Sequence, residues 1–163
     1  MAGAKSNMFV SSKVVKDTTI NNDGTISTKL TIDYKNPYPG SDCGLESGGL
    51  CLNAPLRNWI RVFTPSGSTL GDNKGAISPK DGKPTIFETY ESLGKTVFEG
   101  FLIVNPMGTA KLELTYTSPV KPDGSYKLLI QKQSGTNDEE YTIKLNGKER
   151  KRAPLVTDTE YTF

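Results

Sequence analysis

The sequence contains no histidine, and this absence limits the chemistry that the chain can perform. Serine and cysteine nucleophiles usually rely on a histidine base, and histidine is also the commonest protein ligand of zinc and iron. A hydrolase would need a pair of carboxylates or a lysine base instead. Glu139 and Glu140 do not form such a pair, because adjacent side chains of a strand point to opposite faces. The sequence therefore predicts that the protein is not an enzyme and has no cofactor.

The two cysteines, Cys43 and Cys51, lie in a glycine-rich stretch with seven residues between them. A metal site would need two further soft ligands, and a nucleophilic thiol would need a base. Glycine lets the loop curl until the two sulfurs meet. We therefore predict a disulfide, which implies an oxidising location outside the cytoplasm. A reactive thiol and a metal-binding pair stay open as alternatives.

Aromatic side chains are the best candidates for binding. Trp59 is the only tryptophan. Together with Tyr34, Tyr38 and Tyr90 it could form a platform for a sugar, and we take Trp59 and Tyr38 as predicted ligand-binding residues. The alternative is that Trp59 belongs to the core or its edge, which is commoner for a lone tryptophan in an alternating strand.

Metal and crosslink chemistry have weaker signals. Aspartates occur in turn-like segments rich in Asn, Asp and Gly, but none fits the twelve-residue spacing of a calcium loop. We expect these aspartates, Asp23, Asp72 and Asp81, to serve turn geometry, and we predict no metal site. A Lys–Asn crosslink would need a buried lysine, asparagine and acid, and spacing does not select them; the candidates are Lys29, Glu99 and Asn146.

The net charge of +2 is small, and acids and bases are mixed. A nucleic-acid partner is not expected, because such proteins concentrate basic residues on one face. The one basic run, at 148–152, is predicted to be a solvated loop between two strands. The chain shows no transmembrane run and no signal peptide, so direct membrane insertion of this domain is not expected.

The longest nearly unbroken apolar run, at 96–104, predicts a central strand covered on both faces. Glu99 should lie near a margin, and Gly100 could mark a bulge. Strong turn signals at 21–24 and at Asn146-Gly147 predict hairpins, because these residues accept positive φ angles. Long polar loops are expected at 41–55 and 68–84, and the strand after the central one should run antiparallel to it.

These patterns predict an all-β fold, an antiparallel β-sandwich that is immunoglobulin-like or jelly-roll-like. No window shows the apolar period of a helix. Residues 1–7 are expected to be a leader or a disordered segment, and residues 8–163 a single sandwich domain. About nine strands are predicted, at 8–20, 26–34, 56–64, 86–91, 96–104, 110–117, 126–130, 141–145 and 155–163.

Four segments carry a family resemblance when taken in order: LRNWIRVFTPSGS (56–68), LGKTVFEGF (93–101), YKLLIQKQSGT (126–136) and TDTE (157–160). Together they resemble the C-terminal β-rich part of the bacterial domain-of-unknown-function family 4012, although Ser134 stands where that family has proline. The resemblance implies an extracytoplasmic domain, tethered to the cell surface through other parts of a larger protein. It supplies no catalytic residues.

The sequence as a whole predicts a non-enzymatic surface module with a structural or adhesive role. The alternative is a carbohydrate- or cell-wall-binding module. The partners expected are an extracellular or cell-wall glycan, or another surface protein.

Overall fold

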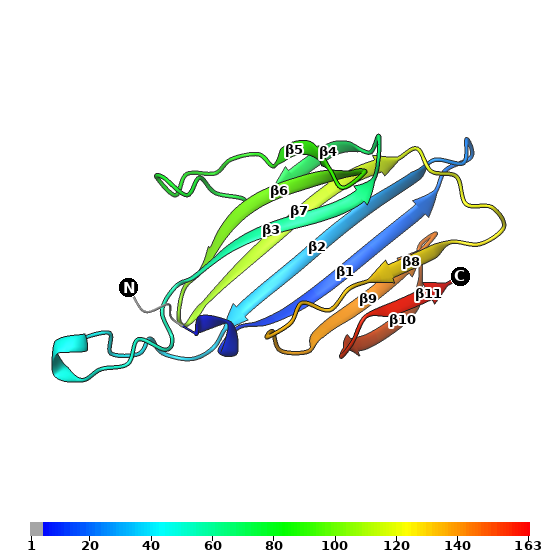
Figure 1. Cartoon of the computed structure of the whole chain (residues 1–163). Coiled ribbons are helices and arrows are strands. Elements are labelled where there is room, and N and C mark those ends of the chain that lie inside the picture. Colours follow the sequence, from blue (N-terminus) through cyan, green and yellow to red (C-terminus); the bar gives the residue numbers. More distant parts are fainter. Residues whose placement is uncertain (1–4) are drawn as a thin grey trace.

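The computed structural model describes residues 5–163, and the regular structure there is almost entirely β-strand (Figure 1). Two short 3-10 turns, η1 (Ser6–Met8) and η2 (Leu45–Ser47), are the exceptions among the described residues. The strands are β1 (Ser11–Ile20), β2 (Ile26–Asn36), β3 (Leu56–Pro65), β4 (Thr69–Lys74), β5 (Glu88–Ser92), β6 (Lys95–Val104), β7 (Gly108–Ser118), β8 (Lys127–Ile130), β9 (Glu139–Leu145), β10 (Lys148–Leu155) and β11 (Thr159–Thr162). The predicted all-β class is confirmed.

One layer is a six-stranded sheet with the order β10-β9-β1-β2-β7-β4. Its pairs are antiparallel except for β1 and β9, which run parallel. A parallel pair needs a long connection between its two strands. Here strands β2 to β8 lie between β1 and β9 in the chain and take the place of a crossover helix. Both predicted hairpins form, and in the second Asn146 and Gly147 take the positive φ angles of 52° and 75°.

The second layer is split into two smaller sheets, β3-β6-β5 and β11-β8. Both pack on the same face of the six-stranded sheet. Phe98, Leu102 and Val104 of β6 contact its central strands, whereas β8 and β11 cover Ile143 and Leu145 of β9. The structure is therefore a sandwich whose second layer is interrupted between β3 and β8.

Strand β6 is buried on both faces, as its apolar run predicts. Gly100 is not a bulge, because the register between β3 and β6 runs without interruption from Leu56 opposite Val104 to Pro65 opposite Lys95. Instead, the ring of Phe87 occupies the space above Gly100, and a Cβ atom there would stand 2.7 Å from Phe87 Cε1. Glycine is needed at this position for close packing.

Two edge strands raise the number from the predicted nine to eleven. Strand β4 lies within the expected loop 68–84, and its register against β7 shifts between Leu70 and Asn73. Strand β10 contains the basic run, and its first five residues are exposed. Neither edge strand shows apolar alternation, because each presents few side chains to the core. The predicted last strand is also divided, since Leu155 ends β10 and β11 covers only Thr159–Thr162.

Other boundaries differ at the N-terminal end and after β6. Residues 1–4 of the expected leader lie outside the described residues. Residues 5–7, by contrast, contact the sandwich, because Ser6 is buried and its Oγ accepts a hydrogen bond from the Ala54 N–H at 3.1 Å. The first strand begins at Ser11 rather than at Met8. Strand β7 does not pair with β6, because the turn between them carries the chain into the other layer.

Candidate functional site

The outer face of the β3-β6-β5 sheet carries a group of aligned aromatic side chains. Cross-strand partners share a face, so Trp59 lies beside Phe101, and Phe63 lies beside Val97. Tyr90 of β5 adjoins Val97 from the other side. We call this surface, made of Trp59, Phe63, Tyr90, Val97 and Phe101, the aromatic face. Between its rings lies a second cross-strand pair, Arg61 and Glu99.

Three of the five side chains of the aromatic face are partly exposed, and the other two are buried beneath them. The exposed fractions are 54% for Trp59, 51% for Phe63 and 37% for Tyr90, whereas Val97 and Phe101 are buried. The Trp59 ring packs on the Phe101 ring with centroids 5.1 Å apart. Such packing holds Trp59 in place while leaving much of its surface free.

Arg61, Glu99 and Tyr90 form a hydrogen-bonded group at the centre of the face. The Arg61 Nε and the Tyr90 hydroxyl both donate to Glu99 Oε2, the latter at 2.9 Å. The hydrogen bond from Arg61 holds the pKa of Glu99 below its ordinary value, and the same carboxylate raises the pKa of Arg61 and of Tyr90. Because its pKa is lowered, Glu99 stays ionised at neutral pH and is poorly suited to act as a general acid or base.

The four aromatic residues proposed from the sequence do not form one platform. Trp59 and Tyr90 share the aromatic face, but Tyr34 belongs to the inner face of β2 and packs against the core. Tyr38 follows the end of β2, where its exposed ring meets the edge of Phe9 with centroids 5.9 Å apart. The structure thus separates the two predicted ligand-binding residues, Trp59 and Tyr38.

Sequence reasoning missed Phe63 and Phe101. Phe63 could have been found, because it lies four residues after Trp59 in a strand and therefore on the same face. Phe101 was assigned to the correct strand, but only the pairing of β3 with β6 places its ring under Trp59.

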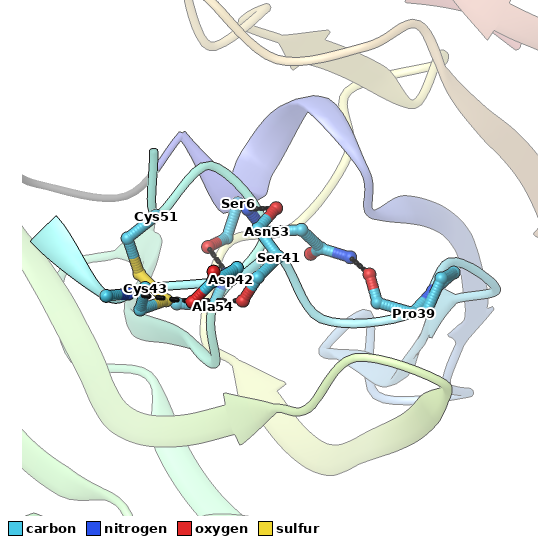
Figure 2. Close-up of a disulfide and its surroundings, with 9 residues drawn as sticks. Ser6, Pro39, Ser41, Asp42, Cys43, Cys51, Asn53 and Ala54 are labelled. Carbon is cyan, nitrogen blue, oxygen red and sulfur yellow. Dashed lines mark hydrogen bonds between the residues drawn. A yellow bond between two sulfur atoms is a disulfide. The ribbon is translucent and has the colours of Figure 1, made fainter. Parts of the chain in front are cut away.

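The predicted disulfide between Cys43 and Cys51 is present and closes the exposed tip of the loop 37–55 (Figure 2). Below the tip, the neck of the loop is held by Asn53. The Asn53 side chain accepts from Asn36 Nδ2 at 2.7 Å and donates to the carbonyls of Tyr38 at 3.2 Å and Pro39 at 2.8 Å. Asn36 and Asn53 are both 1% exposed. The loop is therefore fixed at its base by a buried amide pair and at its tip by the disulfide.

Most of the carboxylates considered for chemistry have structural partners, whereas Asp72 lies in strand β4 rather than in the turn expected for it. Glu140 lies 3.7 Å from the Lys13 amine on the outer face of the six-stranded sheet, whereas Glu139 points inward near Tyr141. Asp23 and Asp81 each accept a backbone N–H two residues ahead, which is the turn role expected of them. Among residues 5–163, no group of three or more Asp, Glu or Cys side chains gathers as metal ligands would.

The crosslink candidates are also far from a common site. Lys29 lies on the outer face of the six-stranded sheet near Glu113, and Glu99 lies on the aromatic face. Asn146 sits in the β9–β10 turn, where its side-chain oxygen accepts the Ile20 N–H. No helix in the described chain is long and apolar enough to cross a membrane.

Comparison of the chain with models of known protein families and with curated proteins finds no match. The resemblance to family 4012 therefore stays a prediction.

Proposed function

We propose that the chain is a non-enzymatic, extracytoplasmic module of a larger bacterial surface protein, and that it is adhesive. The observation that carries this proposal is the aromatic face. Three partly exposed aromatic side chains surround a fixed Arg61–Glu99 pair on one face of a small sheet. A cluster of exposed apolar side chains marks a binding surface more often than other parts of a protein surface do.

The composition of the face supports binding. Trp, Tyr, Phe and Arg are the residues enriched at protein interfaces and among the side chains that dominate binding energy. All four types occur here, in Trp59, Tyr90, Phe63 and Arg61. The packing of Trp59 on buried Phe101 restricts the indole in the free protein, so less conformational entropy is lost on binding.

The disulfide supports the proposed location, because disulfides persist mainly in oxidising compartments. Tethering to a cell surface through other parts of the parent protein follows from the family resemblance. The partner of the aromatic face is then another surface protein.

A glycan is the second candidate partner, and one observation favours it. The flat Trp59 ring lies on the same face as Arg61, Glu99 and the Tyr90 hydroxyl. A sugar could stack its apolar side on the ring while its hydroxyls bond to these polar groups. Cell-wall polysaccharide is the glycan most consistent with the proposed location.

Binding to isolated bacterial cell walls tests the proposal. We expect Trp59→Ala to weaken binding at least tenfold, as loss of a central interface residue does. Val156→Ala is the matched control, because Val156 is an exposed apolar residue in the β10–β11 turn. Equal binding by wild type and Trp59→Ala would contradict the proposal. Protease treatment of the walls should abolish binding if the partner is a protein and preserve it if the partner is a glycan.

A further inference from the structure

The gap in the second layer forms a groove of about 990 Å³ between β3 and the segment 120–131, which includes β8. Figure 1 shows β3 and β8 on either side of the gap, with β1 and β2 beneath it. Inner-face side chains of the six-stranded sheet form the floor of this groove, which we call the interlayer groove. It opens beside the aromatic face, and only the β3 side chains border both.

Both walls of the interlayer groove are free strand edges. Among the described strands, β3 pairs only with β6, and β8 pairs only with β11. The opposite edge of each strand therefore presents backbone N–H and C=O groups that no other strand of the described chain uses. Every residue from Asn58 to Pro65 lines the groove, as expected where the edge of β3 forms its wall.

The floor combines apolar residues with one lysine. Val14, Leu30 and Ile32 line its apolar part, although each is only 4–9% exposed. Lys16 lies between them, opposite Leu30 on one neighbouring strand and Ile143 on the other. Its ammonium donates to the Tyr116 hydroxyl at 2.7 Å and forms no ion pair within the described chain. The Tyr126 hydroxyl also lies beside this ammonium, and burial lowers the pKa of Lys16. A half-buried cation with two tyrosine hydroxyls beside it and no ion pair is an open partner for an acidic group.

The rim of the interlayer groove carries more basic than acidic side chains. Its basic side chains without an ion pair in the described chain are Lys95, Lys121 and Lys127, and its acidic side chains are Asp123 and Glu139. Arg61 also lines the groove, but its charge is already paired with Glu99. With Lys16 in the floor, the groove favours a ligand that carries negative charge.

We propose that the interlayer groove binds an extended, acidic peptide segment of a partner protein by β-strand addition. The segment forms backbone hydrogen bonds with the free edge of β3 and bridges the gap towards β8. A strand repeats its facing side chains every second residue. The segment therefore places one Asp or Glu over Lys16 and apolar side chains two positions before and after it, against the apolar floor.

A blocked nonapeptide, Thr-Thr-Val-Thr-Glu-Thr-Val-Thr-Thr, is the probe. Its valines and glutamate share one face, and its threonines keep it soluble. We expect saturable binding below about 1 mM, followed by amide signals in nuclear magnetic resonance. The signals of Lys16, Leu30 and β3 should move, and amide hydrogen exchange along β3 should slow. Tyr90, on the far side of the aromatic face, should not respond.

Two matched changes identify the contacts. Replacing the peptide glutamate by glutamine should weaken its binding to the wild-type protein about tenfold. The same replacement should not change binding to Lys16→Met, because that variant already lacks the interaction between the two charges. Lys16→Met keeps the length of the side chain and removes a desolvated charge, so the variant should fold. Two further peptides carry N-methyl groups on alternate backbone nitrogens, one on the odd-numbered and one on the even-numbered residues. At least one of the two should fail to bind, because every second N–H of the bound segment donates to the edge of β3.

Three results would overturn the proposal. One is the absence of any shift at 1 mM peptide. Another is binding by both N-methylated peptides. The third is a dimer of the free protein in sedimentation with β3 already protected, which would mean that a second copy fills the groove. None of these results would bear on binding at the aromatic face, which is tested separately by comparing the wild-type protein with Trp59→Ala on cell walls.

Discussion

The neck of the disulfide loop gives a prediction that contrasts two kinds of stabilisation. We expect Asn53→Ala to lower the free energy of unfolding more than removal of the disulfide by Cys43→Ser with Cys51→Ser. The amide pair of Asn36 and Asn53 is buried at the base of the loop. The disulfide closes the exposed tip, and Figure 2 shows it together with Asn53. The more conspicuous covalent feature should therefore contribute less.

The magnitude for Asn53→Ala follows from three lost hydrogen bonds. The Asn36 amide remains buried without its acceptor, which costs about 2 kcal/mol. The carbonyls of Tyr38 and Pro39 belong to exposed residues and can bind water, so each lost bond costs only about 0.5 kcal/mol. The expected destabilisation is about 3 kcal/mol.

For the disulfide, the chain-entropy model gives an upper value. A separation of eight residues corresponds to about 2.5 kcal/mol at 25 °C. The folded loop is already closed below the tip, where the Ser41 N–H bonds to the Asn53 carbonyl at 3.0 Å. The exposed tip regains freedom in the folded state when the bond is removed. This gain offsets part of the entropy gained by the unfolded chain, and we expect a net loss of about 1–2 kcal/mol.

Urea unfolding followed by circular dichroism measures both changes. With a slope of about 2 kcal/mol per molar urea, Asn53→Ala should lower the midpoint by about 1.5 M and the double cysteine variant by less than 1 M. Glu46→Ala, also on the exposed tip, is the control and should leave the midpoint unchanged. A larger shift for the cysteine variant than for Asn53→Ala would show that the disulfide contributes more than the buried amide pair.

Three further predictions concern packing, pH and redox state. Gly100→Ala should destabilise the protein by about 1–3 kcal/mol in thermal unfolding, because the new methyl group meets the ring of Phe87. Gly40→Ala should not, because its new methyl group would lie 3.6 Å from the nearest atom. Equal effects of the two changes would exclude the packing explanation. In urea unfolding, Glu99→Gln should be less stable than wild type at pH 7 and equally stable near pH 2. The pKa of Glu99 is lowered in the folded state, so its carboxylate stabilises the fold above the ordinary pKa of 4.5, and this stability is lost as the pH falls through the lowered pKa. A difference in stability that persists in acid would show that the ion pair with Arg61 is not the cause. Alkylation of intact producing cells followed by mass measurement should leave both thiols unlabelled until reductant is added, and immediate labelling would contradict an oxidising location.

Much of the fold was accessible from the sequence because alternation and turn chemistry are local. The apolar run 96–104 correctly indicated a strand buried on both faces, and Asn146-Gly147 correctly marked a hairpin. Strands β4 and β10 were missed because edge strands bury few side chains. Their pairing is determined by partners distant in sequence or by the preceding turn, not by their own apolar pattern.

The candidate surfaces depended on pairings that a single sequence does not reveal. Trp59 was proposed for binding, but its position over Phe101 depends on the register of β3 with β6. Lys16 could have been noticed, because it shares the inward face of β1 with Val14 and Thr18. The gap above it could not, since it results from the division of the second layer into two sheets.

Binding through the aromatic face can be tested by mapping the bound surface with nuclear magnetic resonance. Soluble fragments released from bacterial cell walls would be titrated into the isotope-labelled protein. We expect the Trp59 indole signal and the amide signals of Phe63 and Tyr90 to move together and saturate, while those of Lys16 stay in place. No movement, or movement confined to residues off the aromatic face, would contradict it.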